Sequence, residues 1–240
     1  QSLRSRHVGG DLTIYLPGDP LAGYLSVPLE GGPWPGVVVI HQAFGLDADI
    51  RRITDRVAHM GYLAVAPDLL AAGRFRCLAR LFRDVRRGSG ESLDRLLALV
   101  DWLKARADCS GRVGVIGFCL GGGLAFLLGC SGSVGAAAPN YGKAPPGDLL
   151  AVSCPVVASY GGLDRFFRKE AVQVGEQLEG SRIVHDVKLY PDAGRAFMNQ
   201  TDDRGPLTAL MGPFMAIGYD RDAAEDAWRR IEGFFARFLQ

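Results

Sequence analysis

The 240-residue sequence lacks the features that mark several classes of protein. It has no run of about eighteen apolar residues, the length that a membrane-spanning helix needs. Neither sign of charge is in excess, because 27 basic residues nearly cancel 26 acidic ones and leave a net charge of +1. We therefore expect no overall electric field that would attract nucleic acid or an acidic membrane surface. A small neutral or singly charged ligand fits this composition better.

Paired cysteines and cofactor-binding motifs are also missing. The cysteines are odd in number, form no C-x-x-C pair and do not cluster with histidine. This pattern predicts reduced thiols in the cytoplasm and argues against a metal site such as structural zinc. The sequence contains no dinucleotide fingerprint and no phosphate-binding loop, so we expect no cofactor. The five cysteines are Cys77, Cys109, Cys119, Cys130 and Cys154.

Apolar runs and amphipathic stretches alternate along most of the chain. Residues 37–40, Val-Val-Val-Ile, have no polar alternation and therefore predict a strand buried on both faces. Residues 223–239 carry apolar side chains at helical spacing and predict a closing helix. The predicted strands are 12–16, 21–27, 37–40, 62–66, 113–118, 136–138, 155–160 and 183–189. The predicted helices are 49–60, 92–107, 120–128, 170–178 and 223–239.

This alternation predicts one α/β domain over residues 1–240, with a mainly parallel sheet covered by helices on both faces. The turn residues 17–20 between the first two strands predict an N-terminal hairpin. In such sheets ligands bind beyond the carboxyl ends of the strands. We therefore expect the chemistry in the loops that follow strands, which are residues 41–47, 67–76, 161–167 and 191–204, and around Cys119.

The strongest local motif is Gly117-Phe118-Cys119-Leu120-Gly121, which has the spacing G-x-C-x-G. A predicted buried strand precedes it and a glycine-rich helix follows. This context is typical of a nucleophile elbow, a tight strand-to-helix turn that exposes its central side chain. A thiol there lies at a helix N-terminus, which favours the thiolate. The alternative is that Cys119 is a small core residue and that the glycines only permit close helix packing.

The segment 113–122, which contains Gly-Phe-Cys-Leu-Gly-Gly, resembles the nucleophile segment of the dienelactone hydrolase family. Further resemblances follow in family order at residues 39–46, 61–69, 190–199 and 226–230. Together they cover the chain from about residue 10 to its end. The resemblance implies an α/β-hydrolase fold and a carboxymethylenebutenolidase-like enzyme with a Cys-His-Asp triad. For this chain it implies Cys119 as nucleophile and Asp164 as the acid. The alternative for Asp164 is an ordinary turn aspartate.

The resemblance also implies an oxyanion hole made by the backbone N–H groups of Leu120 and Ala43. The departures from the family lie where protons are transferred. Arg195 stands at the position of the family's histidine, and Gln42 stands where the family commonly has a glutamate near the thiol. Neither side chain can shuttle a proton, because a guanidinium stays protonated and an amide does not titrate. His41 is the nearest histidine in the motif loops, but a structural role is the preferred interpretation.

Three hypotheses follow for Arg195. In the first, the protein is a thiol hydrolase of small lactones or activated esters, with Arg195 favouring the Cys119 thiolate. In the second, it is a catalytically impaired relative that binds a small acidic metabolite through Arg195. In the third, Arg195 is mobile and structural and pairs with a nearby acid such as Asp192 or Asp202. We expect a small-molecule lactone, ester or carboxylate as partner, neither nucleic acid nor membrane, and a monomer or small homo-oligomer.

Other substrate contacts are less defined. In the family an arginine after the loop that begins at residue 67 commonly binds the substrate carboxylate, and Arg74 and Arg76 are the nearby candidates. The alternative for both is a solvated surface position. Asn199 replaces an anion-binding arginine of some relatives, which argues against dienelactone itself as the substrate.

Overall fold

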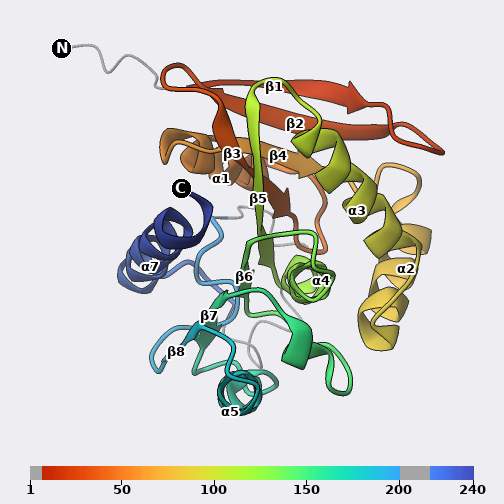
Figure 1. Ribbon diagram of the computed structural model, residues 1–240. Helices are drawn as coiled ribbons and strands as arrows, with labels where there is room; N and C mark the ends of the chain where they lie inside the picture. The colour runs from red at the N-terminus through yellow and green to blue at the C-terminus, as the bar shows by residue number, and fades with distance from the viewer. Residues whose placement is uncertain (1–6, 201–216) are drawn as a thin grey trace.

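The predicted apolar runs form an eight-stranded sheet with the strand order β1-β2-β4-β3-β5-β6-β7-β8 (Figure 1). The computed structural model describes residues 7–200 and 217–240. Strand β1 pairs antiparallel with β2, and β2 pairs antiparallel with β4. All the other neighbouring strands are parallel. The structure therefore confirms the α/β-hydrolase fold, with its mainly parallel sheet and its N-terminal hairpin.

The elements follow one another in the alternation that the sequence predicts. The strands are β1 (His7–Ile14), β2 (Leu21–Pro28), β3 (Trp34–Ile40), β4 (Leu63–Pro67), β5 (Cys109–Phe118), β6 (Ala136–Asn140), β7 (Val156–Gly161) and β8 (His185–Tyr190). The helices are α1 (Ala48–His59), α2 (Arg74–Arg87), α3 (Glu91–Lys104), α4 (Leu120–Gly129), η1 (Leu149–Val152), α5 (Arg168–Gly180) and α7 (Arg221–Leu239).

Three elements differ from the sequence prediction. Strand β1 begins at His7, and its first residues, including Gly9 and Gly10, are mostly exposed, so pairing with β2 rather than burial defines it. The short helix η1 was not predicted. The first residues of helix α2 were expected to form a loop. The helix contains six arginines and buries few side chains, so its sequence shows no clear apolar pattern. Local patterns therefore failed where an element has little buried apolar surface.

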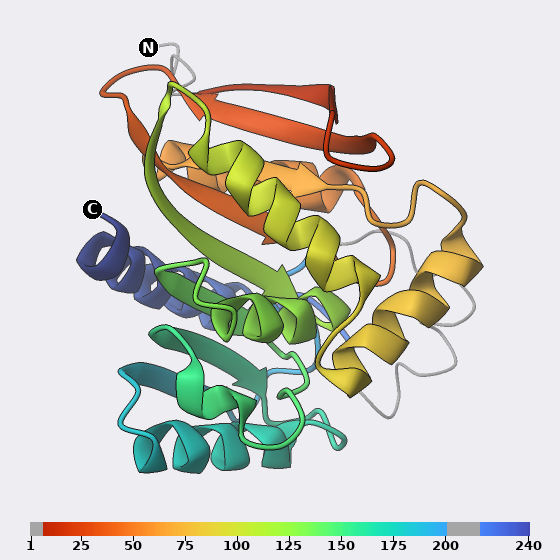
Figure 2. The same ribbon diagram turned by 45° about the vertical axis from the view of Figure 1, so that its right-hand side comes forward.

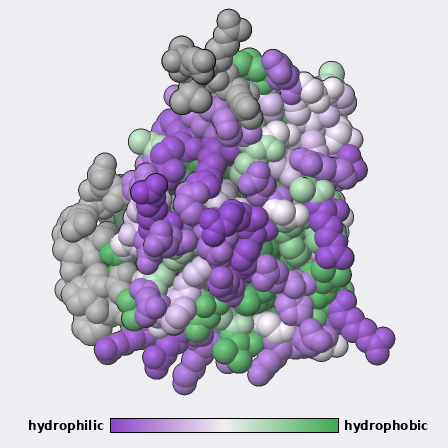
Figure 3. All heavy atoms as spheres, turned by 90° about the vertical axis from the view of Figure 1, so that its left-hand side faces the viewer, coloured by the Kyte–Doolittle hydropathy of each residue, from purple (hydrophilic) through white to green (hydrophobic). Residues whose placement is uncertain are grey.

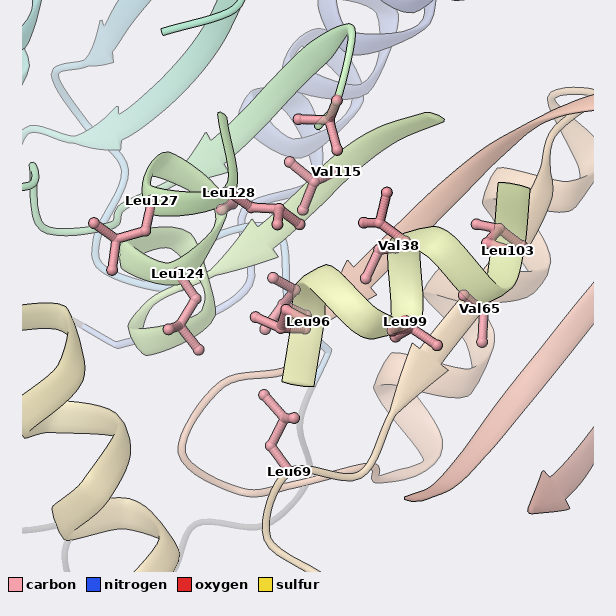
Figure 4. Close-up of a cluster of buried hydrophobic side chains, with 14 of the residues drawn as sticks. Val38, Val65, Leu69, Leu96, Leu99, Leu103, Val115, Leu124, Leu127 and Leu128 are labelled. Atoms are coloured by element: carbon pink, nitrogen blue, oxygen red, sulfur yellow. The ribbon is translucent and has the colours of Figure 1, made fainter. Parts of the chain in front are cut away.

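The two faces of the sheet pack against different helices, because neighbouring residues of a strand point in opposite directions. Val38 packs into a cluster with residues of α3 and α4, including Leu99 and Leu124 (Figure 4). Val37 packs into a second cluster with residues of α1 and α7. The outer surface on the α7 side is mainly hydrophilic (Figure 3). No helix within residues 7–200 or 217–240 is long and apolar enough to cross a bilayer.

The register of the parallel strands brings the predicted motif loops to one edge of the sheet. Ile40 lies opposite Gly117, and Phe118 lies opposite Asn140. Gly161 of β7 lies opposite Tyr190 of β8, the last strand in the order of the sheet. The residues that come next along each strand therefore emerge side by side at the carboxyl edge, where this fold binds its ligands.

Candidate active site

Cys119 occupies the turn between β5 and α4. Its backbone has φ 55° and ψ −112°, in the left-handed half of φ space that side chains other than glycine rarely adopt. The turn is held on both sides, because the Cys119 N–H donates to the Asn140 carbonyl over 3.0 Å and its own carbonyl accepts from the Gly122 N–H over 3.0 Å. This is the geometry of a nucleophile elbow, with the thiol partly exposed.

The flanking glycines permit this turn for a steric reason. A Cβ at Gly117 would overlap the backbone of Gly121, and a Cβ at Gly121 would overlap the carbonyls of Ile40 and His41. The elbow therefore packs directly against the end of β3. This contact brings the loop that contains Gln42 and Ala43 to the side of the elbow.

Arg195 lies between Cys119 and Asp164. Its Nη2 donates to the Cys119 sulfur over 3.2 Å, and its Nη1 donates to Asp164 Oδ2 over 2.7 Å. The guanidinium thus bridges Cys119 and Asp164, the two residues to which the sequence resemblance gives the places of nucleophile and acid. The third hypothesis for Arg195 is wrong in one part, because the side chain points inward and pairs with Asp164 rather than with Asp192. Its other proposed partner, Asp202, lies outside the described residues.

The Arg195 side chain is anchored on several sides. It is 8% exposed, and that of Asp164 is 1% exposed. The guanidinium carbon lies 4.0 Å from the centre of the Phe167 ring. Asp164 is held in turn, because its Oδ1 accepts from the Phe166 N–H over 3.0 Å and from the Phe167 N–H over 3.3 Å. One carboxylate oxygen therefore orders the loop while the other holds Arg195.

The electrostatics keep Arg195 protonated. Burial acts to lower the pKa of Arg195, but the negative charges and hydrogen bonds of Cys119 and Asp164 outweigh burial and raise it. A protonated guanidinium has no lone pair with which to accept a proton. Arg195 can therefore stabilise negative charge on the sulfur or on a substrate, but it cannot act as the general base.

Both ring nitrogens of His41 form hydrogen bonds with backbone groups. Its Nδ1 lies 2.6 Å from the Gln42 carbonyl, and its Nε2 accepts from the Leu69 N–H over 3.0 Å. These contacts require a neutral ring with its proton on Nδ1, and burial lowers the pKa of His41. The geometry supports a structural role, in which His41 joins the loop after β3 to the loop after β4.

Gln42 and Leu120 are buried beside the elbow, whereas Ala43 is partly exposed. The Gln42 carbonyl also accepts from the Gly45 N–H over 3.3 Å, which tightens the loop. Leu120 is the first residue of α4 and directly follows Cys119. Backbone N–H groups at these places can stabilise an oxyanion.

Asn199 is used within a buried polar network. Its Nδ2 donates to Asp49 Oδ2 over 2.7 Å, and its Oδ1 accepts from the Tyr141 hydroxyl. Asp49 also accepts from the Gln200 N–H over 3.1 Å and from Arg52 over 2.6 Å. The Asn199 amide thus ties the segment that carries Arg195 to the first turn of α1. This engagement leaves the amide poorly placed for the substrate contact that its sequence position suggests.

Arg74 and Arg76 are exposed in the first turn of α2. Among the described residues, no hydrogen bond or ion pair joins either of them to Cys119, Asp164 or Arg195. The contact of either arginine with a substrate carboxylate therefore stays a prediction. Within residues 7–200 and 217–240 there is also no group of His, Cys, Asp and Glu side chains arranged to hold a metal ion.

The model of the "Dienelactone hydrolase family" matches residues 21–239, which is most of the chain. The chain belongs to the dienelactone hydrolase family. An Escherichia coli O157:H7 protein named "Putative carboxymethylenebutenolidase" is 30% identical over 253 residues, which cover 96% of this chain and 88% of that protein. A similar protein with the same name in Methylorubrum extorquens is 27% identical over 252 residues and covers 96% and 81% of the two chains.

The fold of this family member is also similar to a crystal structure from Klebsiella pneumoniae described as "Putative Dienelactone Hydrolase". The TM-score is 0.79 at 25% identity, with 97% of this chain and 99% of the other covered. These comparisons identify the protein as a dienelactone hydrolase-like hydrolase.

Two residues beside the triad position were not singled out in the sequence. Tyr141 is fully buried at φ 41°, and burial and the charges of Asp49 and Cys119 raise its pKa well above the usual value. Its hydroxyl therefore keeps its proton and donates to Asn199. Phe167 supplies the ring against which Arg195 lies. In the sequence pattern, an aromatic residue at either position looks like an ordinary core residue. Only its proximity in space to Arg195 or Asn199 shows its role.

Proposed function

We propose that the protein is a thiol hydrolase of small lactones and activated esters, with Cys119 as nucleophile. The observation that carries the proposal is the 3.2 Å hydrogen bond from Arg195 Nη2 to the Cys119 sulfur, made by a guanidinium that Asp164 holds in place. A fixed positive charge beside the sulfur can stabilise negative charge there, and a thiolate attacks without a general base.

In the acylation step the Cys119 thiolate attacks the carbonyl carbon of the substrate. A C–S bond forms while the carbonyl oxygen takes up the negative charge. The backbone N–H groups of Leu120 and Ala43 are proposed to stabilise this oxyanion. The tetrahedral intermediate then collapses, the C–O bond to the leaving group breaks, and an acyl thioester remains on Cys119.

The substrate class follows from the missing proton donor. A leaving group that departs as a stabilised anion, such as an enolate or a phenolate, needs no proton at the moment of bond cleavage. Enol lactones and activated esters have such leaving groups, whereas amides and alkyl esters do not. After acylation the Cys119 sulfur is neutral, so Arg195 can stabilise the departing anion instead.

Deacylation is the slow step in this proposal. Water must attack the thioester, and its proton needs an acceptor. Arg195 is already protonated, and both ring nitrogens of the neutral His41 are engaged in hydrogen bonds with the backbone. Solvent water must therefore accept that proton, which forgoes the factor of about a hundred or more that a positioned base supplies. The acyl-enzyme is expected to accumulate.

The alternative function, binding of an acidic metabolite through Arg195, has less support. Both terminal nitrogens of Arg195 already have partners, Asp164 and Cys119. A ligand carboxylate would have to displace Asp164, which is almost fully buried, or compete with the sulfur. We also propose a cytoplasmic location, because the reaction needs the free thiol that Cys119 presents.

A burst experiment tests the proposed function. The protein is mixed with excess p-nitrophenyl acetate and the release of nitrophenolate is followed from the first turnover. We expect about one equivalent of rapid release followed by slow turnover, and none of the burst in Cys119→Ala. Mass spectrometry should find one acetyl group on the peptide that contains Cys119. Absence of both burst and acylation would contradict the proposal.

A further inference from the structure

Helix α2 carries a local excess of exposed positive charge, although the net charge of the whole chain is only +1. Six of the 27 basic residues lie within its 14 residues. Its one acidic residue, Asp84, is 1% exposed and accepts a hydrogen bond from the Ser92 N–H over 3.0 Å, at the start of α3. The negative charge therefore faces the protein interior while the arginines face outward.

Most of these arginines have no acidic partner. Arg80 pairs with Glu91 over 2.6 Å, and Arg83 reaches the buried Asp84 at 3.4 Å. In the part of the chain that the structure describes, no ion pair involves the remaining arginines of the helix, which are Arg74, Arg76, Arg86 and Arg87. Their charges are available to an external anion.

The exposed face of α2 also carries apolar side chains. Phe75 is 87% exposed and Phe82 is 54% exposed. With Ala79 between them they occur at i, i+4 and i+7, so they form one stripe along the helix. Arg76, Arg83 and Arg87 occur at i, i+7 and i+11 and form a basic stripe beside it. Phe82, Ala79 and Arg83, with Arg86 and Arg87, line a shallow hollow of about 450 Å³.

Among residues 7–200 and 217–240, the main neighbours of α2 lie on its buried side. The helix packs against α3 and α4 rather than on the sheet, and it lies at the outer edge of the molecule in both ribbon views (Figures 1 and 2). Its buried side is Cys77, Leu81, Asp84 and Val85, which is the side opposite the two stripes. A flat surface can therefore meet both stripes at once.

We propose that α2 docks the protein on an anionic phospholipid surface. Guanidinium groups bind phosphates through paired hydrogen bonds, and phenylalanine rings enter the boundary between headgroups and acyl chains. A basic row parallel to an apolar row fits a plane of anionic headgroups above hydrocarbon. The earlier expectation of no membrane contact came from the averaged charge of the chain, which does not describe this helix.

Vesicle binding tests the proposal. The purified protein is sedimented with vesicles of phosphatidylcholine alone and with vesicles of equal parts phosphatidylcholine and phosphatidylglycerol. We expect binding only to the anionic vesicles, weakened by salt because exposed charges are screened. Each arginine near such a surface contributes about a fivefold factor in affinity, so Arg83→Gln, Arg86→Gln and Arg87→Gln together should weaken binding about a hundredfold. Phe75→Ser with Phe82→Ser should also weaken it.

Matched controls remove the same chemistry elsewhere. Arg229→Gln with Arg237→Gln removes two exposed arginines from α7, and Phe166→Ser removes a phenylalanine that is 60% exposed. Both controls should bind anionic vesicles nearly as the wild type does. Circular dichroism checks that every variant is folded. Failure of the wild type to bind anionic vesicles overturns the proposal, as does full binding by the triple arginine variant. Binding to RNA or polyglutamate without binding to vesicles also overturns it.

Discussion

Arg195 donates a hydrogen bond to the sulfur of Cys119 over 3.2 Å, across a separation of 76 residues in the chain. This contact places a permanent cation at the position that the sequence resemblance assigns to a histidine. In the proposed function, Cys119 remains a nucleophile beside a positive charge, and Arg195 cannot shuttle a proton.

Cys119 should be alkylated faster than the other four thiols. Cys77 and Cys109 are buried, and burial raises the pKa of Cys130 to about 11 and that of Cys154 to about 12. Cys119 alone combines partial exposure with a guanidinium partner. Peptide mapping after limiting iodoacetamide measures the order of reaction. Earlier modification of Cys77 or Cys109 would show that the thiol is not presented as the elbow geometry implies.

Arg195→His should raise the steady-state hydrolysis of an activated ester by about a hundredfold or more. The new imidazole would lie next to Asp164 and could take the proton of the attacking water, which speeds deacylation. The burst size should stay near one while the slow phase becomes faster. Adding Gln42→Glu should matter less, because in the proposed function this position tunes the resting thiol and does not transfer the proton during turnover. A folded Arg195→His protein with unchanged turnover would favour the binding-protein function.

Asp164→Asn should lower the free energy of unfolding by about 3 kcal/mol, because it leaves the buried guanidinium without its carboxylate. Urea denaturation measures the change. Asp192→Asn is the matched control, because Asp192 is exposed, and it should change the stability by less than about 0.5 kcal/mol. Replacing both partners, Asp164→Leu with Arg195→Leu, should recover part of the loss. Equal stability of Asp164→Asn and wild type would argue against the buried pair.

Acidification should destabilise the protein through His41. Burial lowers the pKa of His41 in the folded state, whereas the unfolded chain takes up a proton near the ordinary value of about 6.5. The unfolded state therefore binds more protons as the pH falls below about 6.5, and the free energy of unfolding decreases there. His41→Asn should flatten this part of the profile. His59→Gln, at an exposed position, should leave it unchanged, and the same slope in His41→Asn would exclude His41 as the source.

Tyr141→Phe should destabilise the protein by about 1–3 kcal/mol, because it leaves the buried Asn199 Oδ1 without its donor. The rate of Cys119 alkylation in the same variant reports on Arg195. Slower alkylation would mean that the Asn199 segment has moved and has taken Arg195 away from the sulfur. Thermal unfolding and iodoacetamide kinetics measure the two effects separately. Tyr15→Phe, at a position that is 79% exposed, is the control for removal of a hydroxyl. A stability equal to that of wild type would show that the hydrogen bond contributes little.

Much of the fold could be predicted because its signals are local. The apolar run of β3 and the helical spacing in α7 each report burial directly, and Gly117 and Gly121 mark the elbow through a steric requirement. Helix α2 could not be predicted in this way. Its buried side consists of few residues, one of them Asp84, whose burial depends on the start of α3.

The amino-acid sequence alone shows which chemical groups are present: a thiol in an elbow motif, an arginine where the family resemblance implies a histidine, and an acid earlier in the chain. Only the tertiary structure decided where the guanidinium points. An arginine side chain has many rotamers, and the choice among them depends on a buried carboxylate 31 residues away and a ring beneath it. Asp164 and Phe167 select the inward conformation, because a buried charge needs a paired and hydrogen-bonded partner.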